Sequence, residues 1–159
     1  ELRIDVPAHL PANYVQDEAT RLDIYTRLAR AESPAELGEI EDEIELRFGA
    51  MPPPVSHLLA IAGIGLSCRA LRIARIDVGP TGIAARLRPG ARLTPSSRLI
   101  TRGRDRLVYK QKIRTSRTLQ TVIQFIAALG KASAAAPLRG AASRLAKPRR
   151  HDGAVARTS

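Results

Sequence analysis

The chain has 159 residues, a net charge of +11 and a single cysteine, Cys68. This length allows one domain with a buried core and a tail. No stretch approaches the roughly 20 consecutive apolar residues of a membrane-spanning helix, and one cysteine excludes an internal disulfide. We therefore expect a soluble, cytoplasmic protein without a membrane partner. Because residue 1 is Glu1 and falls within a predicted strand, we also expect the chain to be part of a longer protein, or at least a processed product.

The charges are unevenly distributed along the chain. Residues 1–60 hold five Lys or Arg against twelve Asp or Glu, whereas residues 61–159 hold 21 against three. Such an asymmetry predicts two surfaces with different electrostatic partners, although it does not by itself require two domains.

The N-terminal part is predicted to form a strand followed by two helices. Residues 1–6 alternate charged and apolar side chains, as a half-buried strand does. From Asp17 to Ala31 the apolar spacing predicts a helix, and a second helix starts directly after Ser33. A link this short predicts that the two helices pack as a hairpin. The side chains expected on the inner face of the first helix are Leu22, Tyr25, Leu28 and Ala29.

Residues 33–54 carry the strongest helix signals in the chain. Ser33 is a favourable N-cap, Pro34 stands at the first helical position, and Glu36 follows three residues after the cap, which is the pattern of a capping box. Gly49 is expected to end the helix in a left-handed conformation. The predicted buried stripe is Leu37, Ile40, Ile44 and Phe48, and the predicted acidic, solvated side is Glu39, Glu41, Asp42, Glu43 and Glu45.

A third helix is predicted from about Pro53 to Leu71, and a small sheet follows it. Residues 73–87 change to a period of two and predict a β-hairpin around a Gly-rich turn at residues 79–82. We expect a short helix at 95–101, a strand at 106–110, and a closing helix from about Thr115 to Leu129. The inward stripe of the third helix is predicted to be Val55, Leu58, Leu59, Ala62 and Leu66, and that of the closing helix Leu119, Val122, Ile123 and Ile126.

This order predicts an α+β fold. It consists of an N-terminal strand, a helical hairpin, a third helix, a small antiparallel sheet and a closing helix, all in one domain over residues 1–130. Residues 131–159 hold seven Lys or Arg, one acid and no aromatic residue. Such a composition cannot bury enough apolar surface to offset the entropy of ordering, so we expect a disordered basic tail.

The sequence contains no motif that indicates catalysis or cofactor binding. There is no GxxxxGK[ST] loop, and Gly63-Ile64-Gly65 lies in a helical pattern without a third glycine, so helix packing is the favoured interpretation. The three histidines lie far apart and lack the spacing of metal ligands, and Cys68 is expected to be a small core residue. We therefore predict no enzymatic activity, metal or cofactor for this chain.

A dense group of cations supports an alternative function. Residues 98–117 contain eight Lys or Arg, a density that suits the neutralisation of phosphates. Only Tyr109 and Phe125 are nearby as aromatic residues, so no base-stacking platform is evident. This hypothesis is a sequence-independent nucleic-acid-binding module that uses this region and the tail. Its candidate contacts are Arg98, Arg102, Arg104, Lys110, Lys112 and Arg114.

The sequence between Leu10 and Leu59 carries an ordered set of short patterns. They are Leu10-Pro11, Tyr14-Val15, Asp17, Arg21-Leu22, Tyr25, Arg27-Leu28, the Glu-rich helix, Arg47-Phe48-Gly49, Pro52 and Leu58-Leu59. This set resembles the C-terminal domain of the bacterial transcription-repair coupling factor. The resemblance is strong over about residues 1–75, looser to about residue 130, and absent in the tail.

The resemblance implies a non-catalytic regulatory module. In that family an ATP-driven DNA translocase displaces stalled RNA polymerase and recruits nucleotide excision repair through UvrA. Its terminal domain folds back on a UvrB-like module of the same polypeptide, where it hides the UvrA-binding surface and restrains the motor. The ATPase motifs would lie outside this chain.

The resemblance also implies that the acidic helix is the docking surface. Glu43 matches an acidic position of the family, and Leu46 stands where a second acid is usual, with Asp42 or Glu45 as a substitute. A modest affinity suffices for an intramolecular contact, because the tether supplies a high effective concentration. Since Glu43 is expected to be exposed, Glu43→Lys should weaken docking and leave the fold intact. The candidate docking residues are Glu39, Asp42, Glu43, Leu46 and Arg47.

Overall fold

The computed structural model describes residues 1–129, which form helices and one five-stranded sheet and confirm the α+β class. The predicted tail at 131–159 lies outside the described residues. The helices are α1 (Glu18–Arg30), α2 (Pro34–Phe48), α3 (Pro53–Ala70) and α4 (Thr118–Ala128), preceded by a 3-10 turn at Thr115–Arg117. The strands are β1 (Leu2–Arg3), β2 (Ile73–Gly79), β3 (Gly82–Leu87), β4 (Ile100–Arg102) and β5 (Arg106–Lys110).

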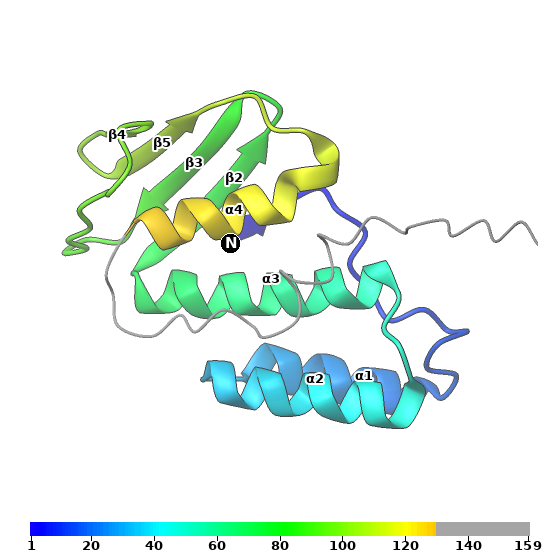
Figure 1. Ribbon diagram of the computed structural model, residues 1–159. Helices are drawn as coiled ribbons and strands as arrows, with labels where there is room; N and C mark the ends of the chain where they lie inside the picture. Colours follow the sequence, from blue (N-terminus) through cyan, green and yellow to red (C-terminus); the bar gives the residue numbers. More distant parts are fainter. Residues whose placement is uncertain (130–159) are drawn as a thin grey trace, which may run out of the picture.

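The elements stack in layers with α3 at the centre (Figure 1). The sheet packs on α3 and α4, and the α1–α2 hairpin packs against the opposite side of α3. The predicted hairpin of the first two helices is therefore confirmed. It lies at the end of the molecule farthest from the sheet (Figure 1).

The sheet has the strand order β1-β2-β3-β5-β4 and is mixed. The strands β2, β3 and β5 pair in antiparallel fashion, as predicted, and β4, which was not predicted, pairs antiparallel with β5. In contrast, β1 pairs with β2 in parallel, with Leu2 opposite Ile76. A parallel pair needs a long crossover connection, which here consists of α1, α2 and α3. The half-buried alternation of Leu2, Ile4 and Val6 is confirmed, because all three pack against the core, although only two residues pair as strand.

The turn between β2 and β3 depends on Gly82. This residue has a φ of 155°, and a Cβ atom placed on it would lie 2.1 Å from the carbonyl oxygen of Tyr109 on β5. Only glycine permits this approach between the two strands. The carbonyl of Pro80 in the same turn accepts a hydrogen bond from the nitrogen of Ile113 at 2.9 Å.

Two hydrophobic clusters meet on α3. One joins α3 to the hairpin and includes Leu37, Ile40 and Ile44 of α2. The other joins α3 to the sheet and α4. The predicted stripe of α3 contacts the hairpin: Val55 and Leu59 are buried, and Leu58, Ala62 and Leu66 pack against the same cluster. The sequence-based stripe missed the second face, which consists of Ala60, Ile64 and Cys68.

Two predicted inner faces require correction. On α1, Leu22 is 60% exposed and Ala29 is exposed, and Ile24 takes the buried position with Leu28. On α4, Ile123 is 38% exposed. Phe125 is buried there instead, with its ring centroid 6.1 Å from that of Tyr109 on β5. In both helices a shift of the buried stripe by one or two positions satisfies the same 3.6-residue period.

The prediction of a short helix at 95–101 was wrong. Residues 95–99 form no helix, and Ile100 begins β4, where it pairs with Tyr109 and is buried. The backbone nitrogen and the hydroxyl of Ser96 donate to the carbonyl of Ala128 at 2.8 and 3.0 Å. Pairing with β5 and attachment to the end of α4 override the local helical tendency of this segment.

Candidate docking surface

The helix α2 is held at its N-terminus by a capping box. The Ser33 hydroxyl accepts a hydrogen bond from the Glu36 nitrogen at 3.2 Å and lies 3.1 Å from the Glu36 carboxylate. That carboxylate also accepts from the nitrogen of Glu32 at 3.0 Å. Since these contacts satisfy amides that lack a partner within the helix, they fix where α2 begins.

The C-terminus of α2 is held by Gly49 and two aromatic rings. Gly49 has a φ of 81°, and its carbonyl accepts a hydrogen bond from the Tyr14 hydroxyl at 2.7 Å. The rings of Tyr14 and Phe48 lie 5.9 Å apart, and the guanidinium of Arg47 lies 5.0 Å from the Phe48 ring. Phe48 is half-buried and packs against the hairpin core, while Arg47 covers it from solvent.

The outer face of α2 presents two exposed acids and one exposed leucine. Glu39 and Asp42 lie one turn apart, and Leu46 follows Asp42 by a further turn. The Leu46 side chain is 89% exposed. Glu41 departs from the predicted solvated side, because its residue is buried at 7% exposure. The acidic face is therefore narrower than the sequence suggested.

Glu43 is bound within the domain on both sides. One of its carboxylate oxygens lies 2.6 Å from Nη2 of Arg27 on α1, and the other lies 2.7 Å from Nη1 of Arg47. Arg27 also lies 3.7 Å from Asp23. Hydrogen bonds from Arg27 and Arg47 lower the pKa of Glu43 from 4.5 to about 2. The expectation of a freely exposed Glu43 was wrong: its side chain is 32% exposed and links α1 to α2.

Sequence reasoning missed Arg27 as a member of this surface. The sequence showed Arg27 only as part of a family pattern. Its ion pair with Glu43 joins residues 16 positions apart on two helices, which local spacing does not reveal. The signal that could have found it is the hairpin itself, since antiparallel neighbours bring opposite charges on facing sides together.

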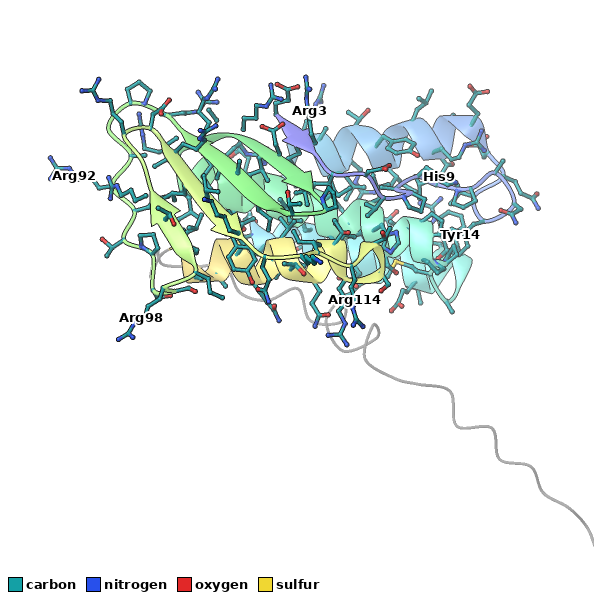
Figure 2. All side chains as sticks on the ribbon, turned by 90° about the horizontal axis from the view of Figure 1, so that it is seen from above. Arg3, His9, Tyr14, Arg92, Arg98 and Arg114 are labelled. Carbon is teal, nitrogen blue, oxygen red and sulfur yellow. The ribbon has the colours of Figure 1, made fainter. Side chains whose placement is uncertain are left out.

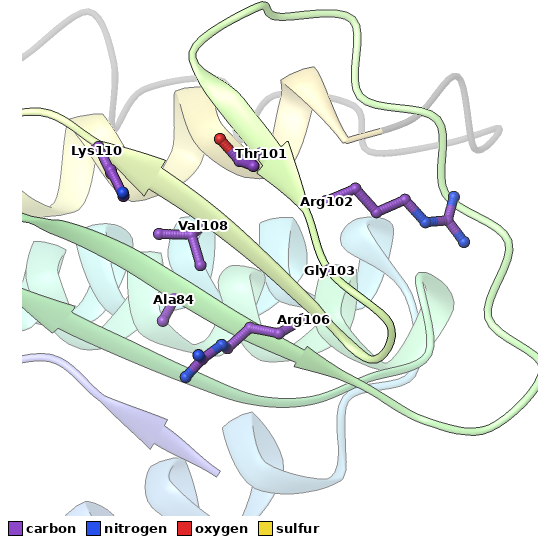
Figure 3. A pocket seen from close by; sticks show the side chains of 7 residues that line it. All are labelled: Ala84, Thr101, Arg102, Gly103, Arg106, Val108 and Lys110. Atoms are coloured by element: carbon purple, nitrogen blue, oxygen red, sulfur yellow. The ribbon is translucent and has the colours of Figure 1, made fainter.

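The candidate cations for nucleic-acid contact do not gather on one surface. Arg98 lies in the loop before β4 and Arg114 just before α4, at separate places on the molecule (Figure 2). Arg104 stands in the turn between β4 and β5, and Lys112 follows β5. Arg102 is directed away from the sheet, because Nη1 donates to the carbonyl of Leu93 at 2.6 Å (Figure 3). Lys110 lies on the face of the sheet that no helix covers.

The other residues considered as possible cofactor, metal or catalytic sites are Gly63, Gly65, Cys68 and His57, and the structure places each of them in packing or backbone contacts. Gly63 and Gly65 lie inside α3, as the packing interpretation predicted. Cys68 is buried, and burial raises the pKa of its thiol to about 11. Nδ1 of His57 lies 2.8 Å from the carbonyl of Pro7. Residues 1–129 contain no group of three or more His, Cys, Asp or Glu that could hold a metal ion. Within the same range no helix combines the length and apolarity needed to cross a membrane.

Comparison with known proteins identifies relatives named transcription-repair-coupling factor. The chain is 34% identical over 110 residues to the transcription-repair-coupling factor of Haemophilus influenzae, covering 69% of this chain and 10% of that protein. It is 38% identical over 97 residues to the factor of Mycobacterium bovis, covering 60% of this chain and 7% of that protein. The chain thus spans a tenth or less of the length of these relatives.

A solved structure shares the fold. The crystal structure of the C-terminal domain of transcription-repair coupling factor superposes with a TM-score of 0.66 and 19% identity, covering 81% of this chain and 90% of that one. In addition, the family model described as TRCF domain matches residues 4–98. The chain therefore belongs to the TRCF domain family, which takes its name from the transcription-repair-coupling factors.

Proposed function

We propose that this chain is a non-catalytic, autoinhibitory module of an ATP-dependent DNA translocase in transcription-coupled nucleotide excision repair. It docks through the outer face of α2 on a UvrB-like module of the same polypeptide and masks the surface that binds UvrA. RNA polymerase engagement by the full-length protein releases it. Membership of the TRCF domain family supports this role, as do the names of the relatives.

The observation that supports docking most is the exposed face formed by Glu39, Asp42 and Leu46. These side chains project from a helix whose two ends are fixed by the capping box and by Gly49. A rigid helix loses little conformational entropy on binding, so even a small contact area yields useful affinity. Within residues 1–129 neither acid takes part in an ion pair, so both carboxylates are available to a basic partner.

Leu46 adds an apolar contribution to a docking contact that is otherwise electrostatic. At 89% exposure it buries almost nothing in the free domain, so it would gain from contact with an apolar patch of the partner. The attraction of Asp42 for a basic partner weakens with salt, whereas burial of Leu46 does not. We expect a docking affinity that falls only moderately between low and high salt.

The test is a calorimetric titration of the 159-residue chain against the UvrB-like module of its parent protein at two salt concentrations. Asp42→Lys should weaken binding about tenfold, equivalent to about 1.4 kcal/mol, and more strongly at low salt. Leu46→Ala should weaken it by a similar factor at both concentrations. Added chain should also reduce the capture of UvrA by the module.

Asp5→Lys is the matched control, because it makes the same charge change on an exposed acid outside α2. An equal loss of affinity in Asp5→Lys would show that overall charge, not the α2 face, governs binding. Absence of a complex at high concentration would refute the docking proposal. Glu43→Lys is a poor probe, because it also places a third cation beside Arg27 and Arg47.

A further inference from the structure

One face of the sheet is covered by helices and the other is open. Ile83, Ala85 and Leu87 of β3 and Leu107 of β5 are buried against α3 and α4. The alternate residues point the opposite way, in register across the two strands: Gly82 opposite Lys110, Ala84 opposite Val108, and Arg86 opposite Arg106. Thr101 of β4 pairs with Val108 and continues this row.

The open face contains a hollow of about 420 Å³ (Figure 3). Ala84, Thr101 and Val108 form its floor, and Arg106 and Lys110 stand at its two ends. These two cations are four residues apart on β5, which separates them by about 13 Å along the strand. The hollow is therefore an elongated, weakly apolar trough between positive charges.

Within the described part of the chain, no ion pair neutralises Arg106 and Lys110 of this trough, or Arg86 beside it on β3. Arg86 and Arg106 are exposed and directly opposite each other, a cross-strand arrangement of like charges that destabilises a sheet. Arg86 contributes to the lowered pKa of Asp77, but the main cause is the hydrogen bond from Arg75, to which this carboxylate is bound at 2.6 Å.

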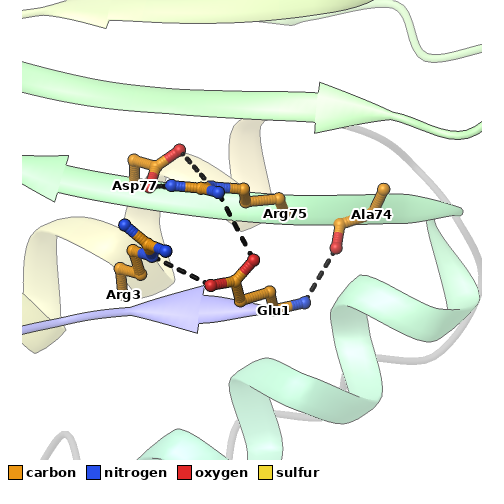
Figure 4. Close-up of polar contacts among 5 residues, drawn as sticks. All are labelled: Glu1, Arg3, Ala74, Arg75 and Asp77. Atoms are coloured by element: carbon orange, nitrogen blue, oxygen red, sulfur yellow. Dashed lines mark hydrogen bonds and ion pairs between the residues drawn. The ribbon is translucent and has the colours of Figure 1, made fainter.

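At the β1–β2 edge of the same face, in contrast, the cations form ion pairs with carboxylates (Figure 4). There Arg3 lies 2.9 Å from Glu1, and Arg75 contacts both Glu1 and Asp77. Cations at this edge are paired, whereas among residues 1–129 no ion pair involves the cations on β3 and β5. The positive charge of the sheet is thus concentrated at the trough.

We propose that this trough binds the phosphate backbone of a single-stranded nucleic acid, with Arg86, Arg106 and Lys110 as phosphate contacts. An extended row of separated cations suits a linear polyanion. The floor of small side chains lets the sugars approach, and the absence of aromatic rings from it predicts binding without base preference. A flexible strand can enter the trough, whereas a rigid duplex would reach only its rim. This site lies on a different element from α2, so the docking proposal stands or falls separately.

The test is fluorescence anisotropy with a labelled 20-nucleotide oligo-dT over a salt series, using the whole chain. Arg106→Gln combined with Lys110→Gln should weaken binding roughly 10–100-fold at about 50 mM salt, because each lost contact lowers the salt slope by about 0.7. The matched control combines Arg98→Gln with Arg114→Gln, two exposed cations outside the trough that cause the same change in net charge.

Selective loss in the trough variant, with unchanged far-UV circular dichroism, would establish the site. Equal losses in both double variants would overturn it, since net charge alone would then explain binding. It would also be overturned if oligo-dT failed to bind at low salt, or if a duplex of the same length bound more tightly. Displacement of oligo-dT by poly-glutamate at equal charge concentration would instead indicate an acidic protein as the partner.

Discussion

Nη2 of Arg27 lies 2.6 Å from the Glu43 carboxylate and joins the two helices of the hairpin that carries the proposed docking face. Arg27 and Glu43 should therefore couple energetically. Since both side chains are about one-third exposed, we expect a coupling free energy of about 0.5–1 kcal/mol. The measurement is a double-mutant cycle with Arg27→Met and Glu43→Gln in urea unfolding. Additive effects of the two substitutions would show that the contact contributes no stability.

The same carboxylate predicts a dependence of stability on pH. Its folded-state pKa of about 2 lies below the ordinary 4.5. The charged form therefore stabilises the fold at neutral pH, and this contribution is lost as the pH falls from about 4.5 toward 2. The free energy of unfolding of the wild type should exceed that of Glu43→Gln by about 1 kcal/mol at pH 7. This difference should shrink as the pH falls from about 4.5 toward 2.

Urea unfolding of the wild type and Glu43→Gln at pH 7, 4 and 2.5 measures this difference in the free energy of unfolding. Asp17 and Asp77 also have pKa values lowered by hydrogen bonds, from Thr20 and Arg75 respectively. Both proteins will thus lose stability in acid, and the comparison with Glu43→Gln isolates the contribution of one carboxylate. A difference that stays constant with pH would contradict the assignment.

Substitution of the two glycines of the β2–β3 turn by alanine should affect stability very differently. Gly82→Ala places a Cβ atom 2.1 Å from the Tyr109 carbonyl oxygen, so β3 and β5 must move apart. We expect a loss of roughly 2–4 kcal/mol in the free energy of unfolding. Gly79→Ala is the control, because nothing lies within 4 Å of its added Cβ, and it should change stability by less than about 0.5 kcal/mol. Similar melting temperatures for the two variants would refute this.

Arg106→Glu should stabilise the free domain while impairing the proposed trough. The substitution replaces a repulsive cross-strand pair with an attractive one opposite Arg86, a change worth about 0.5–1 kcal/mol. Thermal unfolding should therefore shift upward, and oligo-dT binding should weaken in the same variant. A lower melting temperature would mean that Arg106 stabilises the fold by more than its repulsion from Arg86 destabilises it.

The sequence predicted local structure well where short-range signals agree. The cap at Ser33, the end of α2 at Gly49 and the β2–β3 hairpin each depend on residues within a few positions of one another. Contacts between distant segments were not predictable in this way. The attachment of Ser96 to Ala128 turned an expected helix into the approach to β4.

The candidate docking face was predicted as a helix side but not in its details. Spacing placed Glu39 and Asp42 on the solvated side of the helix, and the family resemblance added Leu46; all three residues are exposed. It could not reveal that Arg27 reaches Glu43, nor that Glu41 is buried. The candidate cations showed the same limit. Arg98, Arg104, Lys112 and Arg114 lie in the loops and turns around β4 and β5, and only Arg102 and Lys110 lie on the strands, so clustering in sequence did not bring them onto one surface.

The position of α3 between two hydrophobic clusters has a consequence for how the domain opens. Val55 and Leu59 contact the hairpin, while Ala60 and Ile64 contact the sheet layer, so either layer can separate while the other still protects the helix. Amide hydrogens of α3 should therefore exchange with solvent more slowly than those of α1 or β4, which have neighbours on one side only. Hydrogen exchange followed by NMR measures this directly. If the proposed docking face were pulled away with its hairpin, the sheet and its trough would remain folded on α3.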